Sequence, residues 1–221
     1  MNNFYPKIIG ILIGLFFCFQ TKAQVNDAGL WLNVNVEKKI TQKFSTQFTH
    51  SLRFYENISE LSTSFSEIGL SYKIIKPITV GGFYRFSQNK RVDDFYSTGH
   101  RYSFYISYKL KVKQVKINFR EQFQSRYKDI ETSATGGIPK NHLRSKIALS
   151  YNLEKKYTPY VSAELFYEIG EYIDNVRYKA GVEYEWNKFN TFNLYYMIDK
   201  EMNVKNPWTN YVIGLGYNFT F

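Results

Sequence analysis

The sequence predicts an all-β fold, an antiparallel transmembrane β-barrel of the outer-membrane type with about 10–12 strands. Three observations support this prediction. Apolar and polar residues alternate over long stretches, a short apolar segment stands near the N-terminus, and the chain ends on alternating apolar and aromatic residues. Tyr is also frequent, with 20 among 221 residues. Tyr is favoured at membrane interfaces, because one part of its side chain is apolar and the other polar.

The first 23 residues are predicted to be a signal peptide that is cleaved after Ala23. Lys7 precedes an apolar run over residues 8–19, and Thr21 and Ala23 place small residues at the −3 and −1 positions. A retained membrane helix is the alternative, but such a helix needs roughly 20 apolar residues. Cleavage leaves one domain, residues 24–221. The only cysteine, Cys18, is then lost, so disulfides and thiolate metal sites are excluded.

The clearest alternation runs over residues 40–55. Its even positions include Phe44, Phe48 and Leu52, and all odd positions from 41 to 53 are polar. Strands in globular proteins average about 5–6 residues, whereas a tilted membrane strand needs roughly 9–11. The length of this run therefore favours a membrane strand, with its apolar face in lipid and its polar face in the lumen.

The same alternation recurs along the chain, and ten strands are expected from residue 40 to the C-terminus. Residues 28–36 resemble an eleventh strand. Bacterial single-chain barrels have even strand numbers, so either this segment is an inner or partial strand or the division of the chain into strands is inexact, and ten to twelve strands are expected. Glu121 falls on the apolar face, and a β-bulge near it is expected to redirect its side chain.

The connections are expected to alternate in length. Short ones contain residues 37–39, 76–77, 113–114, 154–156 and 187–188, and longer ones cover 56–61, 89–99, 128–140, 168–175 and 199–207. Outer-membrane barrels have short periplasmic turns and longer external loops. The longer connections are therefore predicted to face outward.

Charged side chains on the polar face are predicted to line the lumen. The formal net charge is +10, and it stays at about +8 after Lys7 and Lys22 are removed. The candidate lumen cluster is Arg53, Arg85, Arg101, Arg120, Arg144, Lys146, Glu164, Arg177, Lys179 and Glu183. Paired charges would fill a narrow barrel and close it, which is the favoured interpretation. The alternative is a passage or pocket that attracts anions.

Three resemblances add to this interpretation. Residues 211–221 resemble the C-terminal signal strand that the barrel-assembly machinery recognises, with Tyr217, Phe219 and Phe221 on its apolar face. The Ala23–Gln24 junction is similar to those of Bacteroidota. The third resemblance rests on Leu30-Trp31, Arg53, residues 143–146, residues 160–164, Arg177-Tyr178 and Gly181. In these residues the mature chain resembles a Bacteroidota family of outer-membrane barrels known only as a domain of unknown function. This family implies no reaction and supplies no catalytic residues.

No catalytic, cofactor or metal site is expected. His50, His100 and His142 have no partners at metal-ligand spacing, and residues 133–137 lack the Lys-Ser/Thr end of a phosphate-binding loop. His50 is taken as the only histidine on the apolar face, and a lipid hydrolase would need a nucleophile beside it, but Ser51 points to the other face.

The predicted function is therefore a non-enzymatic outer-membrane barrel that is structural or weakly conducts anions. Its expected partners are outer-membrane lipid and lipopolysaccharide, the barrel-assembly machinery and a candidate anionic solute. Export excludes nucleic acid. An outer-membrane enzyme that modifies lipids and a soluble periplasmic β protein that binds anions are the alternatives.

Overall fold

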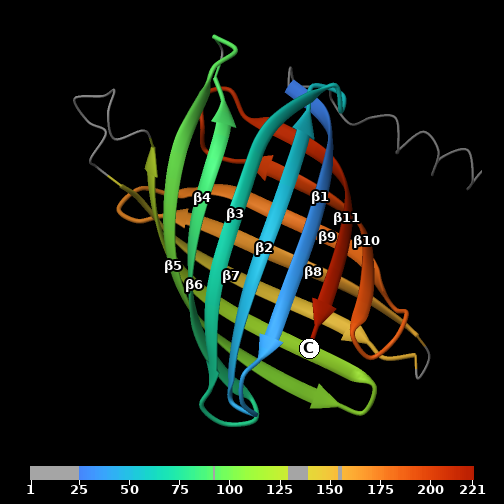
Figure 1. Cartoon of the computed structure of the whole chain (residues 1–221). Coiled ribbons are helices and arrows are strands. Elements are labelled where there is room, and N and C mark those ends of the chain that lie inside the picture. The colour runs from blue at the N-terminus through green and yellow to red at the C-terminus, as the bar shows by residue number, and fades with distance from the viewer. Residues whose placement is uncertain (1–24, 92, 129–138, 154–155) are drawn as a thin grey trace, which may run out of the picture.

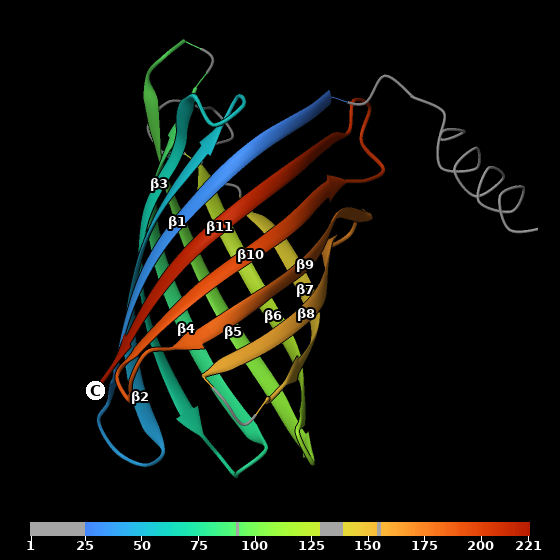
Figure 2. The same cartoon turned by 90° about the vertical axis from the view of Figure 1, so that its right-hand side faces the viewer.

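A computed structural model describes residues 25–91, 93–128, 139–153 and 156–221, and these residues form one closed sheet of eleven strands (Figures 1 and 2). The strands are β1 (Val25–Lys39), β2 (Phe44–Tyr55), β3 (Glu60–Lys73), β4 (Ile78–Lys90), β5 (Tyr96–Val112), β6 (Val115–Lys128), β7 (Lys140–Tyr151), β8 (Tyr157–Glu168), β9 (Ile173–Glu185), β10 (Asn190–Glu201) and β11 (Trp208–Thr220). The predicted all-β barrel is confirmed. The predicted signal peptide and residues 133–137 lie outside the described residues.

The barrel closes through a parallel pair, β1 with β11, while every other neighbouring pair is antiparallel. The eleven strands fall within the predicted range of about 10–12, but the alternative in which residues 28–36 form an inner or partial strand is wrong. These residues belong to β1, a full strand of 15 residues, and its register with β11 runs from Val25↔Trp208 to Glu37↔Thr220. With an odd number of strands the first and last run in the same direction, so Val25 and Phe221 lie at opposite ends of the barrel (Figure 1).

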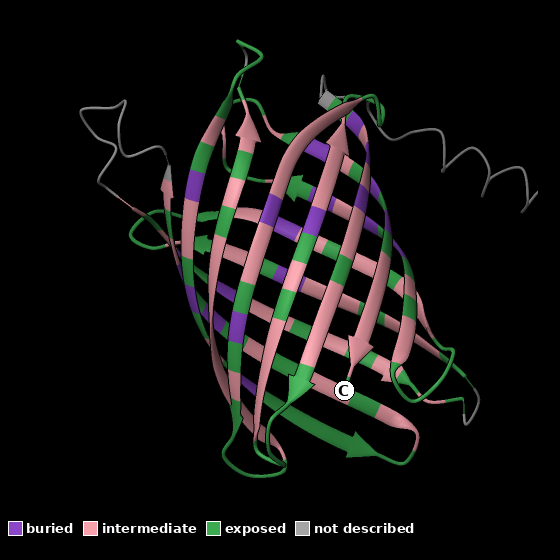
Figure 3. Ribbon diagram, viewed as in Figure 1, coloured by how far each residue is buried: buried purple, intermediate pink, exposed green. Residues whose placement is uncertain are grey.

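The outer face is a continuous apolar surface. Phe104, Ile68 and Leu194 are 65%, 55% and 53% exposed, and the exposure alternates along each strand as Figure 3 shows. An apolar surface of this extent on a monomer is typical of a face that contacts lipid. None of the described residues forms a helix that is long and apolar enough to cross a membrane.

The alternation in the sequence suggested a uniformly polar inner face, but part of this face is apolar. Trp31, Tyr195, Met197 and Val212 form a buried cluster where β1, β10 and β11 meet, and Tyr55 and Tyr160 pack against it. Met197 and Val212 are fully buried. Large side chains therefore fill the lumen beside the parallel pair, as expected for a barrel of few strands.

Glycines on the inner face make room for these aromatic rings. A Cβ atom on Gly214 would lie 1.9 Å from Cζ of Tyr195. Gly214→Ala should therefore lower the free energy of unfolding by roughly 1–3 kcal/mol, because the ring must shift inside a packed cluster. Chemical unfolding measures this loss. Gly216→Ala is the control, since its nearest neighbour would be 3.3 Å away, and an equal loss in both variants would contradict the packing argument.

The connections differ less in length than predicted, because the strands continue farther toward the end of the barrel that was expected to face outward. β4 reaches Lys90 and β5 begins at Tyr96, so most of the expected loop 89–99 is strand. The turns after β2 and β8 cover only residues 56–59 and 169–172. Residues 129–138 of the expected loop 128–140 lie outside the described residues.

Glu121 stays on the outer face. The register of β6 with both neighbours is continuous through this residue, so the bulge that was expected to redirect it is not there. Ser145 donates a hydrogen bond of 2.8 Å to the Glu121 carboxylate instead. The irregular positions lie at Arg53/Phe54 and Phe166/Tyr167.

The C-terminal residue joins the last strand to the first. The amide of Phe221 donates to the carbonyl of Glu37 at 3.0 Å, and the carbonyl of Phe221 accepts from the amide of Lys39 at 2.9 Å. Deleting Phe221 should lower the yield of assembled barrel far more than deleting the exposed turn residue Lys205, because these contacts and the predicted assembly signal are lost together. Heat-modifiable migration of the membrane fraction on gels measures assembly, and equal yields of both variants would contradict this role.

Candidate functional site in the lumen

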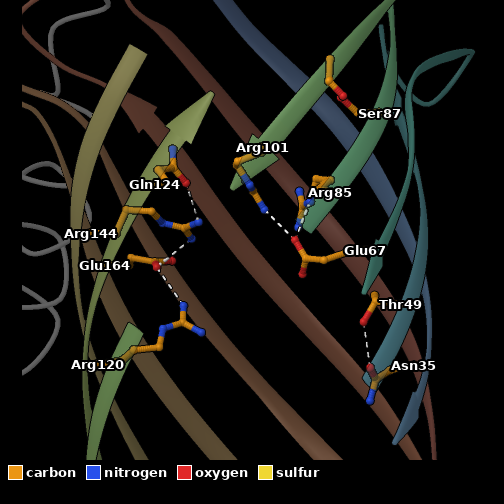
Figure 4. A network of polar contacts seen from close by, with 11 residues as sticks. Asn35, Thr49, Glu67, Arg85, Ser87, Arg101, Arg120, Gln124, Arg144 and Glu164 are labelled. Carbon is orange, nitrogen blue, oxygen red and sulfur yellow. Dashed lines mark hydrogen bonds and ion pairs between the residues drawn. The ribbon is translucent and has the colours of Figure 1, made fainter. Parts of the chain in front are cut away.

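The first group of lumen charges joins β3, β4 and β5. The carboxylate of Glu67 accepts from Arg85 Nε at 2.8 Å and from Arg101 at 3.0 Å. Glu67 stands opposite Arg85, and Arg85 opposite Arg101, in the strand register. Opposite charges at adjacent positions of one sheet face stabilise each other. One carboxylate thus accepts hydrogen bonds from two guanidinium groups (Figure 4).

The second group joins β6, β7 and β8. Glu164 accepts from Arg144 at 2.8 Å and from Arg120 at 3.1 Å, and Arg144 also donates to Gln124 at 3.2 Å (Figure 4). In the register Glu164 lies between Lys146 on β7 and Arg177 on β9. Glu164 therefore stands between two basic positions of the same sheet face. Its side chain is only 5% exposed, so the group lies in a largely dry part of the lumen.

Aromatic rings hold the remaining basic groups. The guanidinium of Arg53 lies 3.7 Å from the ring centre of Trp31 and 4.9 Å from that of Phe65. Lys179 Nζ lies 3.8 Å from the ring centre of Tyr195. Such cation–π contacts are attractive, and they are stronger where water is excluded. Arg177 completes the set with an ion pair of 2.6 Å to Asp199 on β10.

We call these side chains the charged belt. It contains eight basic residues and three acidic ones, an excess of five positive charges: Arg53, Arg85, Arg101, Arg120, Arg144, Lys146, Arg177 and Lys179 against Glu67, Glu164 and Asp199. Buried charges without an opposite partner are costly. The belt is therefore a place where mobile anions are attracted.

Cavities lie on both sides of the charged belt. The outer cavity, about 480 Å³, includes Arg53, Arg85, Arg101, Arg126 and Arg177 in its lining. The inner cavity, about 810 Å³, lies toward the end of the barrel where Phe221 is found. Its lining includes Lys116, Lys146, Lys179, Glu183 and Glu185. The two linings share no residue, and Glu67, Arg120, Arg144 and Glu164 belong to neither. The belt thus separates two basic chambers.

A family model described as "Protein of unknown function (DUF2490)" matches residues 28–210, most of the chain. The chain belongs to this family. No curated protein matches this DUF2490 chain. The fold is similar to the β domain of the Bordetella autotransporter Brka, with a TM-score of 0.50 and 9% identity over 83% of this chain and 86% of that chain. It is also similar to the KdgM porin in complex with disordered oligogalacturonate, with a TM-score of 0.46 and 13% identity over 76% of this chain and 82% of that chain.

The structure brings together most of the predicted lumen cluster of this DUF2490 protein. Glu183 takes no part in the ion pairs found among the described residues, and it lines the inner cavity together with Lys116, Lys146 and Lys179. Sequence reasoning missed Phe65, Phe166 and Tyr195 as partners of the basic groups. Each is an aromatic residue on the polar face of its strand, close to charged residues in the sequence. This placement could have indicated that their rings lie in the lumen.

The fold also assembles a group that sequence spacing did not indicate. His142, Glu168 and Asp174 bring their ligand-type atoms within 4.8 Å of one another at the outer cavity. His142 Nε2 contacts Asp174 at 2.9 Å, and Lys140 pairs with Glu168 at 3.1 Å. His142 thus contacts one oxygen of the Asp174 carboxylate, while the other, Oδ1, has no hydrogen-bond partner among the described residues. The three residues come from β7, the end of β8 and the start of β9.

Two histidines, not one, lie on the outer face. His100 Nδ1 contacts the Tyr84 hydroxyl at 2.8 Å, in an aromatic surface with Phe86. His50 Nδ1 lies 3.0 Å from the hydroxyl of Ser66 on the adjacent strand β3. Ser51, the neighbour of His50 in the sequence, points inward as expected and donates to Asn33.

Proposed function

We propose that this DUF2490 protein is a non-enzymatic outer-membrane barrel whose lumen is closed at mid-height by the charged belt. It acts as a structural or solute-binding barrel and conducts small anions weakly or not at all. The observation that carries this proposal is the separation of the two cavities by the ion-paired side chains of Arg120, Arg144 and Glu164, which line neither of them. A barrel of eleven strands is narrow enough for long side chains to fill it.

The apolar outer face and the alternating strands support an outer-membrane location. The end that carries the turns 56–59 and 202–207 faces outward, and Phe221 lies at the periplasmic end. Fractionation tests this part of the proposal: the mature protein should begin at Gln24 and sediment with the outer membrane. Recovery as a soluble periplasmic protein would favour the anion-binding soluble alternative and contradict the proposal.

Planar-bilayer recording tests the closure. The purified wild-type barrel should show little or no conductance. A variant with Ala at Arg120, Arg144 and Glu164 removes three side chains from the belt and should conduct. It should favour anions, because Arg53, Lys146 and Lys179 remain in the lumen.

A variant with Ala at the exposed residues Lys111 and Lys113 is the control and should stay closed. Wild-type conductance as large as that of the belt variant would contradict the closure and favour an open passage. In that case Glu at both Arg120 and Arg144 should weaken the preference for anions. A preference for cations in the wild type would contradict the electrostatic argument.

An enzyme that modifies lipids is the second candidate, favoured by the contact between His50 and Ser66. A histidine base beside a serine hydroxyl is the core of a nucleophilic site, but such a base is normally oriented by a third group. Among the described residues, no further hydrogen bond to the His50 ring is found. The wild type, incubated with a labelled phospholipid, should give no more product than the variant Ser66→Ala. Wild-type turnover that is lost in this variant would support the enzyme.

A further inference from the structure

We infer that the outer cavity is a binding site for a phosphate-type oxyanion with two negative charges, held by the guanidinium groups of Arg53, Arg85, Arg101 and Arg177. The inference adds a ligand class to the proposed function. It rests on that function, because the ligand must reach the cavity from outside the cell. All four residues line the one cavity of about 480 Å³. That size lies within the range of roughly 300–1,000 Å³ that small-molecule sites occupy.

The floor of this cavity is short of negative charge. Arg85 and Arg101 share the single carboxylate of Glu67, and Arg177 bonds to Asp199. No ion pair or hydrogen bond of the Arg53 side chain is found among the described residues. Four guanidinium groups thus face two carboxylates, an excess of two charges. A dianion neutralises this excess, whereas a singly charged anion leaves half of it.

The acidic residues of the same cavity lie at the ends of their strands, apart from its floor. Glu168 pairs with Lys140 at 3.1 Å, and Asp174 contacts His142 at 2.9 Å. Glu201 accepts from the amide of Trp208 at 3.1 Å. These three residues belong to the ends of β8, β9 and β10, away from the Glu67 group. The surplus positive charge therefore remains at the floor.

Aromatic rings hold the guanidinium groups in place. Arg53 lies over Trp31, Arg85 lies 3.4 Å from the ring centre of Phe65, and Arg177 lies 4.9 Å from that of Phe166. The faces of these cations are occupied, so their edges remain for a ligand. The planar N–H edge of Arg matches the oxygens of phosphate bidentately. Groups that are already held in position lose little conformational freedom on binding.

The cations lie close enough to one another to share a ligand. Arg85 stands opposite Arg101 in the strand register, and Arg53 and Arg177 both contact the ring of Trp31. Like charges placed this close repel one another. An oxyanion placed among them relieves this repulsion and gains charge-assisted hydrogen bonds. The ion pairs of Glu164 below the site close the way inward, so the ligand is held rather than passed through.

Titration calorimetry on the purified full-length mature barrel in neutral detergent tests the inference with inorganic phosphate at low salt. Phosphate should bind with one-to-one stoichiometry and more tightly than acetate or chloride. Arg53→Gln should weaken the binding of phosphate roughly tenfold or more, since a charge-assisted hydrogen bond is lost. Arg126→Gln should weaken it several-fold without touching the aromatic contacts of the floor.

Lys116→Gln in the inner cavity is the matched control and should leave phosphate binding unchanged. No phosphate binding by the wild type, equal affinity for phosphate and acetate, or equal losses in Lys116→Gln and Arg126→Gln would each overturn the inference. Arg126→Gln keeps the test valid if Arg53→Gln fails to fold. If the barrel fractionates with the outer membrane and stays closed but does not bind phosphate, only this inference is contradicted. A soluble or freely conducting protein contradicts the proposed function instead.

Discussion

Glu164→Gln should lower the free energy of unfolding by about 3–5 kcal/mol, the loss typical of removing one partner of a buried ion pair. The Glu164 carboxylate accepts from Arg144 at 2.8 Å and from Arg120 at 3.1 Å, and it faces Lys146 across the strand pair. Without its charge, three cations remain together in a dry part of the lumen. Urea unfolding of the barrel in lipid vesicles, followed by Trp fluorescence, measures the loss.

Glu171→Gln in the exposed turn after β8 is the matched control, and its stability should equal that of the wild type, because surface charges contribute little. The unfolding of Glu164→Gln should also become more sensitive to the anion present, since phosphate or sulfate can partly replace the lost carboxylate. If Glu164→Gln is as stable as Glu171→Gln, water screens the charges of the belt, and the proposed closure of the lumen is wrong.

The sequence predicted the two faces of the barrel because a strand places successive side chains on opposite sides. Arg120 and Arg144 could be assigned to the lumen from this alternation alone. The parallel closure could not be predicted in this way. It depends on the pairing of β1 with β11, which are separated by most of the chain, and period-two alternation carries no information on which strands become neighbours.

The contacts between side chains of neighbouring strands depend on strand register and are invisible in sequence spacing. Ser66 reaches His50 because β2 and β3 place these residues opposite each other. His142 meets Asp174 across two strand pairs, 32 positions along the chain. Phe65 looked like an ordinary strand residue, although its ring holds two arginines in the lumen. Sequence patterns therefore gave the chemistry of each face but not the partners within it.

Phe104→Arg should destabilise the barrel by roughly 2–4 kcal/mol, because Arg at the midplane of a bilayer must leave water without a partner. Phe104 is 65% exposed on the outer face, near the middle of β5. Ala148→Arg is the control, because Ala148 lines the inner cavity, where a long polar side chain reaches water. Urea unfolding in vesicles compares the two variants. Phe104→Leu should change stability little, since it keeps an apolar side chain in contact with lipid. Equal losses in Phe104→Arg and Ala148→Arg would show that the apolar face does not lie in a membrane, and a soluble barrel would then fit the protein better.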